Sequence, residues 1–239
     1  MKIIILAAGV GKRFGKTTEK FPKCLISIGK KGDNLLSRTL GILRALGLKD
    51  IVIVVGHQKE KIKKECRKIG KGLGIRFVFN KNYRQGSVVS LFIGLKELNE
   101  DCLIMDADVY FPKEALKKLV RSKHRTAFLI DRKSKSSGEE MMLMAKNGLP
   151  CAIAKKVDPS LKILGESVGF FKVSRDDAAY LKKILSDFVK RGNVNVEYED
   201  TYNVLMKKRK VGFESMGGFF WTEMDFKEDL QKIRKFLQN

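Results

Sequence analysis

Apolar and polar positions follow two rhythms along the chain, and the first half shows both in regular succession. Short apolar runs, typical of buried strands, occupy residues 3–8, 51–55, 76–79 and 102–105. Between them, apolar residues recur three and four positions apart, which predicts helices over 35–45, 59–69 and 88–98. This alternation predicts strand–helix–strand units and a mainly parallel sheet.

The second half has a different rhythm. It predicts strands at 127–130, 141–146, 152–157, 168–173, 211–214 and 218–221, and helices at 176–190, 198–208 and 226–237. Strands without regular helical crossovers indicate mixed pairing. The expected fold class is therefore α/β, with a Rossmann-like, mixed but mainly parallel sheet flanked by helices. We expect one domain over 1–239, made of two halves at about 1–125 and about 126–239.

The lengths of the apolar runs and the spacing of the cysteines indicate where in the cell the protein is found. The apolar runs are far shorter than the roughly 20 residues needed to cross a bilayer, so we expect a soluble, cytoplasmic protein without membrane insertion. The four cysteines are widely spaced and form no C-x-x-C pair, which indicates reduced core residues rather than a zinc site or a disulfide framework. The sequence leaves the oligomeric state open, a homodimer included.

The net charge of +22 makes nucleic acid the first partner to consider, because a strongly basic protein attracts polyanions. The basic residues fall on predicted helix faces, however, and no recognition-helix or RNA-stacking motif accompanies them. We therefore expect no nucleic-acid partner. Abundant lysine with few glutamines is also compatible with a heat-adapted organism.

The first strand leads into a glycine-rich loop. Gly9, Gly11 and Gly15 have no side chain to keep phosphate oxygens away from the backbone N–H groups. Lys12, Arg13 and Lys23 supply neutralising charge nearby. This combination predicts a site for a triphosphate.

Two familiar phosphate motifs do not fit this loop. A dinucleotide fingerprint needs a third small residue where Phe14 stands. A Walker A loop ending at Gly15 needs glycine where Val10 stands. Its lysine should also open a helix, yet Pro22 disfavours helix at the residue before it, so the segment after Gly15 is predicted to be a loop.

The run from Leu6 to Arg13, followed by Pro22-Lys23, resembles the L-A-A-G-x-G-x-R…P-K signature of nucleotidyltransferases that activate sugar phosphates and related alcohol phosphates. The resemblance implies that the loop holds a nucleoside triphosphate and that Lys23 lies near the reacting α-phosphate. It assigns nucleotide binding to Leu6, Ala7, Ala8, Gly9, Gly11, Lys12, Arg13 and Lys23, and catalytic roles to the last two.

Two carboxylates stand two residues apart where the strand at 102–105 ends. Asp106 and Asp108 therefore share one side of the strand end, where ligands of open α/β sheets bind. Such oxygens suit Mg²⁺, the cofactor we expect, although either aspartate could simply shape a turn. The family resemblance assigns the metal to Asp108, with Asp106 near the nucleotide.

A second acidic stretch precedes the last predicted helix. Asp225 and Glu228 have capping-box spacing, so Asp225 could be an N-cap worth roughly 1 kcal/mol. In the family this aspartate is the second protein ligand of the catalytic metal. The resemblance thus makes Arg13, Lys23, Asp108 and Asp225 the catalytic set, and Glu223 could reach the metal through a water.

A polar loop precedes the predicted helix at 88–98. Amide, hydroxyl and exposed backbone groups of this kind can match a base edge. Ser87 could equally serve as a helix N-cap. In the family this stretch contacts the base, which implies nucleotide contacts from Asn80, Gln85, Gly86 and Ser87.

Two stretches of the second half, 165–171 and 198–203, resemble the short cytidylyltransferases that act on phosphocholine and inositol 1-phosphate. Taken singly, their residues favour a core strand and an amphipathic helix. The loop at 131–138 could close over an acceptor phosphate. The resemblance implies acceptor binding by Gly169, Phe170, Glu199, Asp200, Tyr202 and Trp221.

These features predict an enzyme in which a phosphorylated alcohol attacks the α-phosphate of a nucleoside triphosphate. A phosphate monoester is largely dianionic at pH 7, so no catalytic histidine is required. The resemblance favours CTP with myo-inositol 1-phosphate, in phospholipid or compatible-solute biosynthesis. Phosphocholine comes next, then sugar 1-phosphates with UTP or dTTP. From another class, a nucleotide sensor or a basic RNA-binding protein could use the same scaffold.

Overall fold

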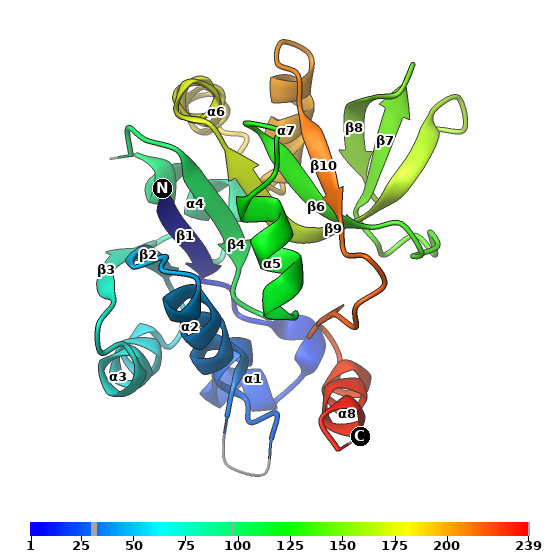
Figure 1. The fold of residues 1–239 in the computed structure, drawn as a ribbon. Coiled ribbons are helices and arrows are strands. Elements are labelled where there is room, and N and C mark those ends of the chain that lie inside the picture. The colour runs from blue at the N-terminus through cyan, green and yellow to red at the C-terminus, as the bar shows by residue number, and fades with distance from the viewer. Residues whose placement is uncertain (30–32, 97, 239) are drawn as a thin grey trace.

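A mixed sheet of nine strands lies at the centre of the computed structural model, which describes residues 1–29, 33–96 and 98–238 (Figure 1). Its main path runs β10-β6-β9-β4-β1-β2-β3, and β7 pairs with β9 and with β8. A separate two-stranded ladder joins β11 to β5. The strands are β1 (Lys2–Ala7), β2 (Asp50–Val55), β3 (Gly74–Phe79), β4 (Cys102–Asp106), β5 (Val109–Tyr110), β6 (Ala127–Asp131), β7 (Met142–Lys146), β8 (Leu149–Ala154), β9 (Lys162–Val173), β10 (Gly212–Ser215) and β11 (Thr222–Glu223).

The pairing directions divide the sheet as the sequence predicts. Strands β3, β2, β1 and β4 are mutually parallel, with Ile3 opposite Ile51 and Leu103. Strand β9 runs antiparallel to β4, β6 and β7, so one long strand ties the two halves into a continuous sheet. The expected α/β class with a mixed, mainly parallel sheet is confirmed.

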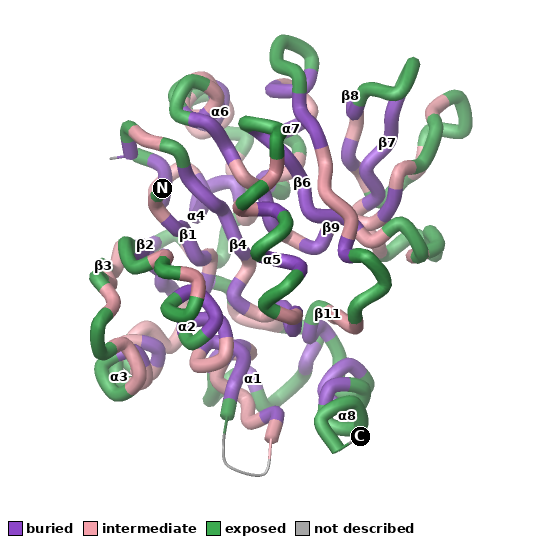
Figure 2. The backbone as a smooth tube through the Cα atoms, in the orientation of Figure 1, coloured by how far each residue is buried: buried purple, intermediate pink, exposed green. Residues whose placement is uncertain are grey.

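Helices cover both faces of the sheet, as Figure 1 shows. Alternate residues of the buried strands point to opposite faces, so Ile3 and Ile5 pack with one helix layer and Ile4 with the other. In Figure 2 the central strands are largely buried and the outer sides of the helices are exposed. The first layer contains α2 (Leu35–Ala45), α3 (Lys59–Ile69) and α5 (Lys113–Val120), and the second α4 (Ser87–Leu95), α6 (Arg175–Lys190) and α7 (Glu199–Met206).

A third, smaller cluster lies below the carboxyl ends of the central strands. Helix α8 (Lys227–Phe236) contributes Leu230 and Ile233, which pack with Phe14 and Tyr110. Phe14 belongs to a 3-10 turn, η1 (Lys12–Phe14), directly after the glycine-rich loop. The last helix therefore braces the predicted triphosphate loop from beneath.

Several predicted elements need correction. The segment after Gly15 contains a one-turn helix, α1 (Thr17–Lys20), where a loop was expected; Phe21, before Pro22, returns to extended geometry. Residues 218–221 form no strand, because Gly217 and Gly218 have positive φ angles of 72° and 80° and turn the chain.

Three predicted ranges differ from the observed elements by three residues or more. The strand expected at 152–157 spans Leu149–Ala154, and the one expected at 168–173 starts at Lys162. The helix expected over 88–98 ends at Leu95, and residue 97 of that range lies outside the described residues.

Within the described ranges, no helix is long and apolar enough to cross a membrane. The cysteines are free: Cys24, Cys66 and Cys102 are buried and Cys151 is half-buried.

Candidate active site

The carboxyl ends of β1 and β4 open into a cavity of about 450 Å³. This is the position at which ligands of open α/β sheets bind. The first half contributes residues 6–13, 83–87 and 106–108 to its wall, and the second half contributes 139–141, 166–167 and 197–199. The cavity thus lies where the two halves of the chain meet.

Three carboxylates from distant parts of the chain converge in this cavity. Strand β11 pairs antiparallel with β5, placing Glu223 opposite Val109, and Met224 N donates to Asp108 O at 2.9 Å. This short ladder brings Glu223 and Asp225 beside Asp108. One carboxylate oxygen of each lies within 4.8 Å of the others. An all-oxygen donor set of this kind fits a hard divalent cation such as Mg²⁺.

Two cations hold Asp108 and Asp225 in place. Lys23 Nζ lies 2.7 Å from Asp108 Oδ2 and 2.6 Å from Asp225 Oδ1, and Arg13 Nη2 lies 2.7 Å from Asp225 Oδ2. The Lys23 side chain is only 12% exposed. Its burial opposes the charged form, but Asp108 and Asp225 outweigh that effect and raise the pKa of Lys23. Lys23 therefore stays protonated at neutral pH.

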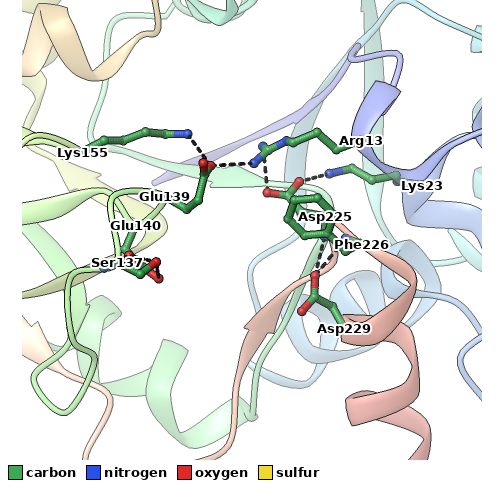
Figure 3. Close-up of polar contacts among 9 residues, drawn as sticks. All are labelled: Arg13, Lys23, Ser137, Glu139, Glu140, Lys155, Asp225, Phe226 and Asp229. Atoms are coloured by element: carbon green, nitrogen blue, oxygen red, sulfur yellow. Dashed lines mark hydrogen bonds and ion pairs between the residues drawn. The ribbon is translucent and has the colours of Figure 1, made fainter.

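Figure 3 shows how this cluster reaches the second half of the chain. Arg13 Nη1 lies 3.9 Å from a carboxylate oxygen of Glu139, and Lys155 Nζ lies 3.4 Å from the same oxygen. Neither Glu139 nor Lys155 is among the site residues predicted from the sequence. Both are exposed charged residues outside any motif, and only the proximity of Glu139 to the predicted closing loop at 131–138 hinted at a role.

The N-terminal cap of α8 distinguishes the two predicted roles of Asp225, which are helix N-cap and metal ligand. The N-cap position is Phe226, and Asp229 Oδ2 accepts hydrogen bonds from Asp225 N at 3.1 Å and Phe226 N at 2.9 Å (Figure 3). The capping box predicted from Asp225 and Glu228 is therefore wrong by one residue. Since Asp229 caps the helix, the Asp225 carboxylate is free to face Lys23 and Arg13.

The glycine-rich loop lines the cavity as predicted, through Leu6, Ala7, Ala8, Gly9, Gly11, Lys12 and Arg13. Gly11 has a φ of +70°, and an added Cβ would lie 2.8 Å from Lys23 Cγ. Both the backbone conformation and the packing of Lys23 thus require glycine there.

The polar loop before α4 is placed in part as expected. Gln85, Gly86 and Ser87 line the cavity. Asn80 is fully buried and does not: its Nδ2 donates to Ser90 Oγ at 3.0 Å and its Oδ1 accepts from Asn82 N at 2.9 Å. Asn80 therefore shapes the turn. The N-cap position of α4 is Gly86, so Ser87 does not cap the helix as its alternative interpretation proposed.

Among the predicted acceptor residues, Glu199 lines the cavity. Phe170 and Tyr202 lie in the hydrophobic core instead, where Phe170 packs edge-on against Phe111 with ring centres 4.7 Å apart, and Tyr202 packs against Phe171 at 4.4 Å. Phe170 packs into the first helix layer and Tyr202 into the second, so neither ring reaches the cavity wall.

The remaining three acceptor candidates lie behind or beside the wall. Gly169, with φ +79°, backs Asp106: an added Cβ would lie 2.5 Å from Asp106 Oδ2. Trp221 Nε1 donates to Asp131 Oδ2 at 3.0 Å, and Asp200 is exposed outside the cavity. Gly169 and Trp221 thus support the site without lining it.

One residue absent from the predicted site stands out. Tyr198 lines the cavity, is only 6% exposed, and donates its hydroxyl to Asp106 Oδ2 at 2.5 Å. Burial, followed by the charge of Asp106, raises the pKa of Tyr198, so the phenol is a neutral donor. Its position directly before Glu199 was the only sequence signal for it.

A comparison with protein families agrees with this geometry. The family described as the MobA-like NTP transferase domain matches residues 3–169, which include the glycine-rich loop, Lys23 and Asp108. This chain belongs to that family. The resemblance of the N-terminal signature to nucleotidyltransferases is thereby confirmed.

Similar proteins cover the whole of this NTP transferase. Choline-phosphate cytidylyltransferase of Streptococcus pneumoniae is 29% identical over 100% of this chain and 99% of its own length. The bifunctional IPC transferase and DIPP synthase of Aquifex aeolicus is 25% identical over 98% of this chain, which spans 51% of that relative. The structure of the inositol-1-phosphate CTP transferase from T. maritima has a TM-score of 0.79 at 20% identity, covering 99% of this chain and 94% of that one. This last likeness confirms the fold.

Proposed function

We propose that this NTP transferase is a cytidylyltransferase, which transfers CMP from CTP to a phosphorylated alcohol and releases pyrophosphate. The observation that carries the proposal is the position of Lys23, held between Asp108 and Asp225 beside the glycine-rich loop. The cytidylyl specificity is supported by two of the similar proteins: the Streptococcus pneumoniae relative is named for cytidylyl transfer, and the T. maritima structure is named for CTP.

The chemistry needs charge neutralisation more than proton transfer. An oxygen of the acceptor phosphate forms a bond to the α-phosphorus of CTP, while the bond from that phosphorus to the leaving pyrophosphate breaks. Arg13 and Lys23 supply positive charge where the transferring phosphoryl group gains negative charge. Asp108 and Asp225 would hold Mg²⁺, with Glu223 near enough to contact it through water, and the ion would neutralise the triphosphate.

The acceptor that the sequence favours is myo-inositol 1-phosphate. The carboxyl groups of Glu166 and Glu199 line the second-half side of the cavity, and their oxygens can accept hydrogen bonds from polyol hydroxyls. Phosphocholine is the alternative. An aromatic cage for its trimethylammonium does not form from Phe170 and Tyr202, because both rings lie in the core.

The test is pyrophosphate release in the presence of Mg²⁺. CTP, UTP, dTTP, ATP and GTP are each combined with myo-inositol 1-phosphate, phosphocholine and glucose 1-phosphate. We expect release with CTP and myo-inositol 1-phosphate, and none when EDTA replaces Mg²⁺. Release with phosphocholine alone would keep the reaction and change the acceptor. Nucleotide binding without release from any pair would contradict the proposal and favour a sensor.

A further inference from the structure

The segment between α6 and α7, residues 194–198, lies against the nucleotide half of the site. Its backbone accepts two hydrogen bonds from the start of α4: Gly86 N donates to Val194 O at 2.7 Å, and Val88 N donates to Val196 O at 3.4 Å. The approach is so close that a Cβ on Gly86 would lie 2.1 Å from Val196 O. We call residues 194–198 the linking segment.

Ser87 fixes the linking segment to the polar loop with its side chain. Ser87 Oγ donates to Glu197 Oε2 at 2.5 Å and accepts from Tyr198 N at 2.8 Å. The residue that the family resemblance assigns to base contact therefore already has its hydroxyl engaged by the second half of the chain. Because these hydrogen bonds connect the two segments, a movement of the loop at 84–87 would also displace the linking segment.

Tyr198 fixes the other end of the linking segment to the metal-binding side. Its hydroxyl donates to Asp106 Oδ2 at 2.5 Å, and Asp106 stands two residues before Asp108 on the same strand end. Gly169 lies against the same oxygen of Asp106, so close that an added Cβ would come within 2.5 Å of it. The next residue after Tyr198 is Glu199, which lines the acceptor side of the cavity.

We infer that Ser87 and Tyr198 are positioning residues that make occupancy of the nucleotide loop and order in the acceptor wall mutually dependent. A nucleotide that orders residues 84–87 also fixes Ser87, hence the linking segment and Glu199. The first substrate to bind then bears the entropy cost of ordering the wall. The second substrate binds without that cost, so each substrate raises the affinity for the other. This inference rests on the proposed function, because it needs a nucleotide at the loop.

Hydrogen exchange with CTP alone tests the inference, because no acceptor is needed. In the wild-type protein we expect CTP to slow exchange at 84–91 and also at 194–206, although the latter segment belongs to the acceptor side. In Ser87→Ala and in Tyr198→Phe, the slowing at 194–206 should fall about tenfold, a typical coupling factor, while protection at 84–91 remains at saturating CTP. Ser87→Thr keeps the hydroxyl and should restore the wild-type pattern.

Ser122→Ala is the matched control. Ser122 Oγ donates to Glu214 Oε1 at 2.6 Å and accepts from His124 N at 3.1 Å, the same pair of contacts that Ser87 makes, but outside the cavity. This variant should leave both protected segments unchanged. Thermal unfolding shows whether each variant is folded.

The outcomes separate the two proposals. Protection confined to 84–91 in the wild-type protein would overturn the coupling while leaving cytidylyl transfer intact. Protection at neither segment, together with no pyrophosphate release, would reject the proposed function itself. In steady-state kinetics, reciprocal coupling predicts that Tyr198→Phe raises the KM of each substrate by a similar factor, about tenfold, when the other substrate is saturating.

Discussion

At the scale of single residues, the site is organised around a lysine that is nearly buried. Lys23 has two carboxylate partners within 2.7 Å, and one of them is shared with Arg13. A buried charge of this kind is tolerable only while its partners remain. The same contacts place a cation beside the carboxylates that would hold the metal, so each member of the cluster affects both charge balance and chemistry.

The substitution Asp108→Asn tests this arrangement with little change of shape. It removes one carboxylate from Lys23 and one from the trio that would bind Mg²⁺, so pyrophosphate release should fall by at least roughly 10²–10³-fold. Asp158→Asn is the control, since Asp158 contacts Ser160 on an exposed loop. An unchanged rate in Asp108→Asn would contradict the assigned role.

Glu199 makes a prediction about pH. Burial raises its pKa from the ordinary 4.5 to about 8, so between these values the folded protein holds a proton that the unfolded chain releases. Stability should therefore fall as pH rises from 4.5 to about 8. Because Glu199 is half-buried rather than fully enclosed, we expect a loss of roughly 2 kcal/mol by pH 8.

Glu199→Gln removes that titration. Urea unfolding should show the variant more stable than wild type at about pH 8 and nearly equal at about pH 4, because glutamine resembles the protonated acid. An equal pH dependence of the two proteins would show that Glu199 is solvated.

Sequence could predict the charged cluster of Arg13, Lys23, Asp108 and Asp225, because each of these residues belongs to a motif with fixed spacing. For Phe170 and Tyr202 the residues taken singly favoured a core position, whereas the family resemblance implied acceptor binding, and the structure places both rings in the core. On β9 and α7 both faces carry apolar residues, and the side that faces the cavity depends on neighbouring strands that are distant in sequence. Glu139 and Lys155 were not predicted, because they are exposed charged residues that belong to no motif and follow no periodic pattern.

At the scale of elements, the two-residue ladder between β5 and β11 has an effect out of proportion to its length. It sets Glu223 and Asp225 beside Asp108, and α8 starts immediately afterwards. Hydrophobic pattern predicted α2 and α3 to the residue, because their apolar stripes are regular. It misplaced the strand before α8, because the Gly217-Gly218 turn interrupts the apolar run.

The cap of α8 gives the prediction at this scale. Asp229→Ala removes the acceptor for two backbone N–H groups and should cost about 1 kcal/mol of stability. It should also lower activity, since Asp225 N loses the bond that orients its residue. Glu228→Ala is the control: Glu228 holds the position that the sequence pattern assigned to the capping box, yet Asp229 makes those contacts. Chemical denaturation that ranked Glu228→Ala as the more damaging change would contradict this assignment.

At the scale of the whole molecule, the charge is the dominant property. A net charge of +22 destabilises the compact state through self-repulsion, while the cavity gathers carboxylates and cations in close pairs. The expected absence of a nucleic-acid partner remains a prediction, since charge alone attracts any polyanion.

Salt should therefore stabilise this protein. Raising NaCl from about 0.01 M to about 1 M shortens the screening length from about 30 Å to about 3 Å, which weakens long-range repulsion between the many exposed cations. We expect Tm to rise by several degrees in a thermal scan, and KCl should act like NaCl because screening depends on ionic strength. A falling Tm would show that surface ion pairs outweigh the repulsion.

Strand β9 limits how such an enzyme can be re-engineered. Its residues pair with β4 of the nucleotide half and with β6 and β7 of the other, so a chain cut near residue 125 would leave β4 as an open edge. The proposed catalytic cluster would be cut as well, since Asp225, which pairs with Lys23, lies beyond that point. Recombination at the middle of the gene therefore cannot exchange the proposed acceptor wall as a separate unit. The proposed acceptor wall can change by single substitutions of its residues, while the sheet that the two halves share stays unchanged during evolution.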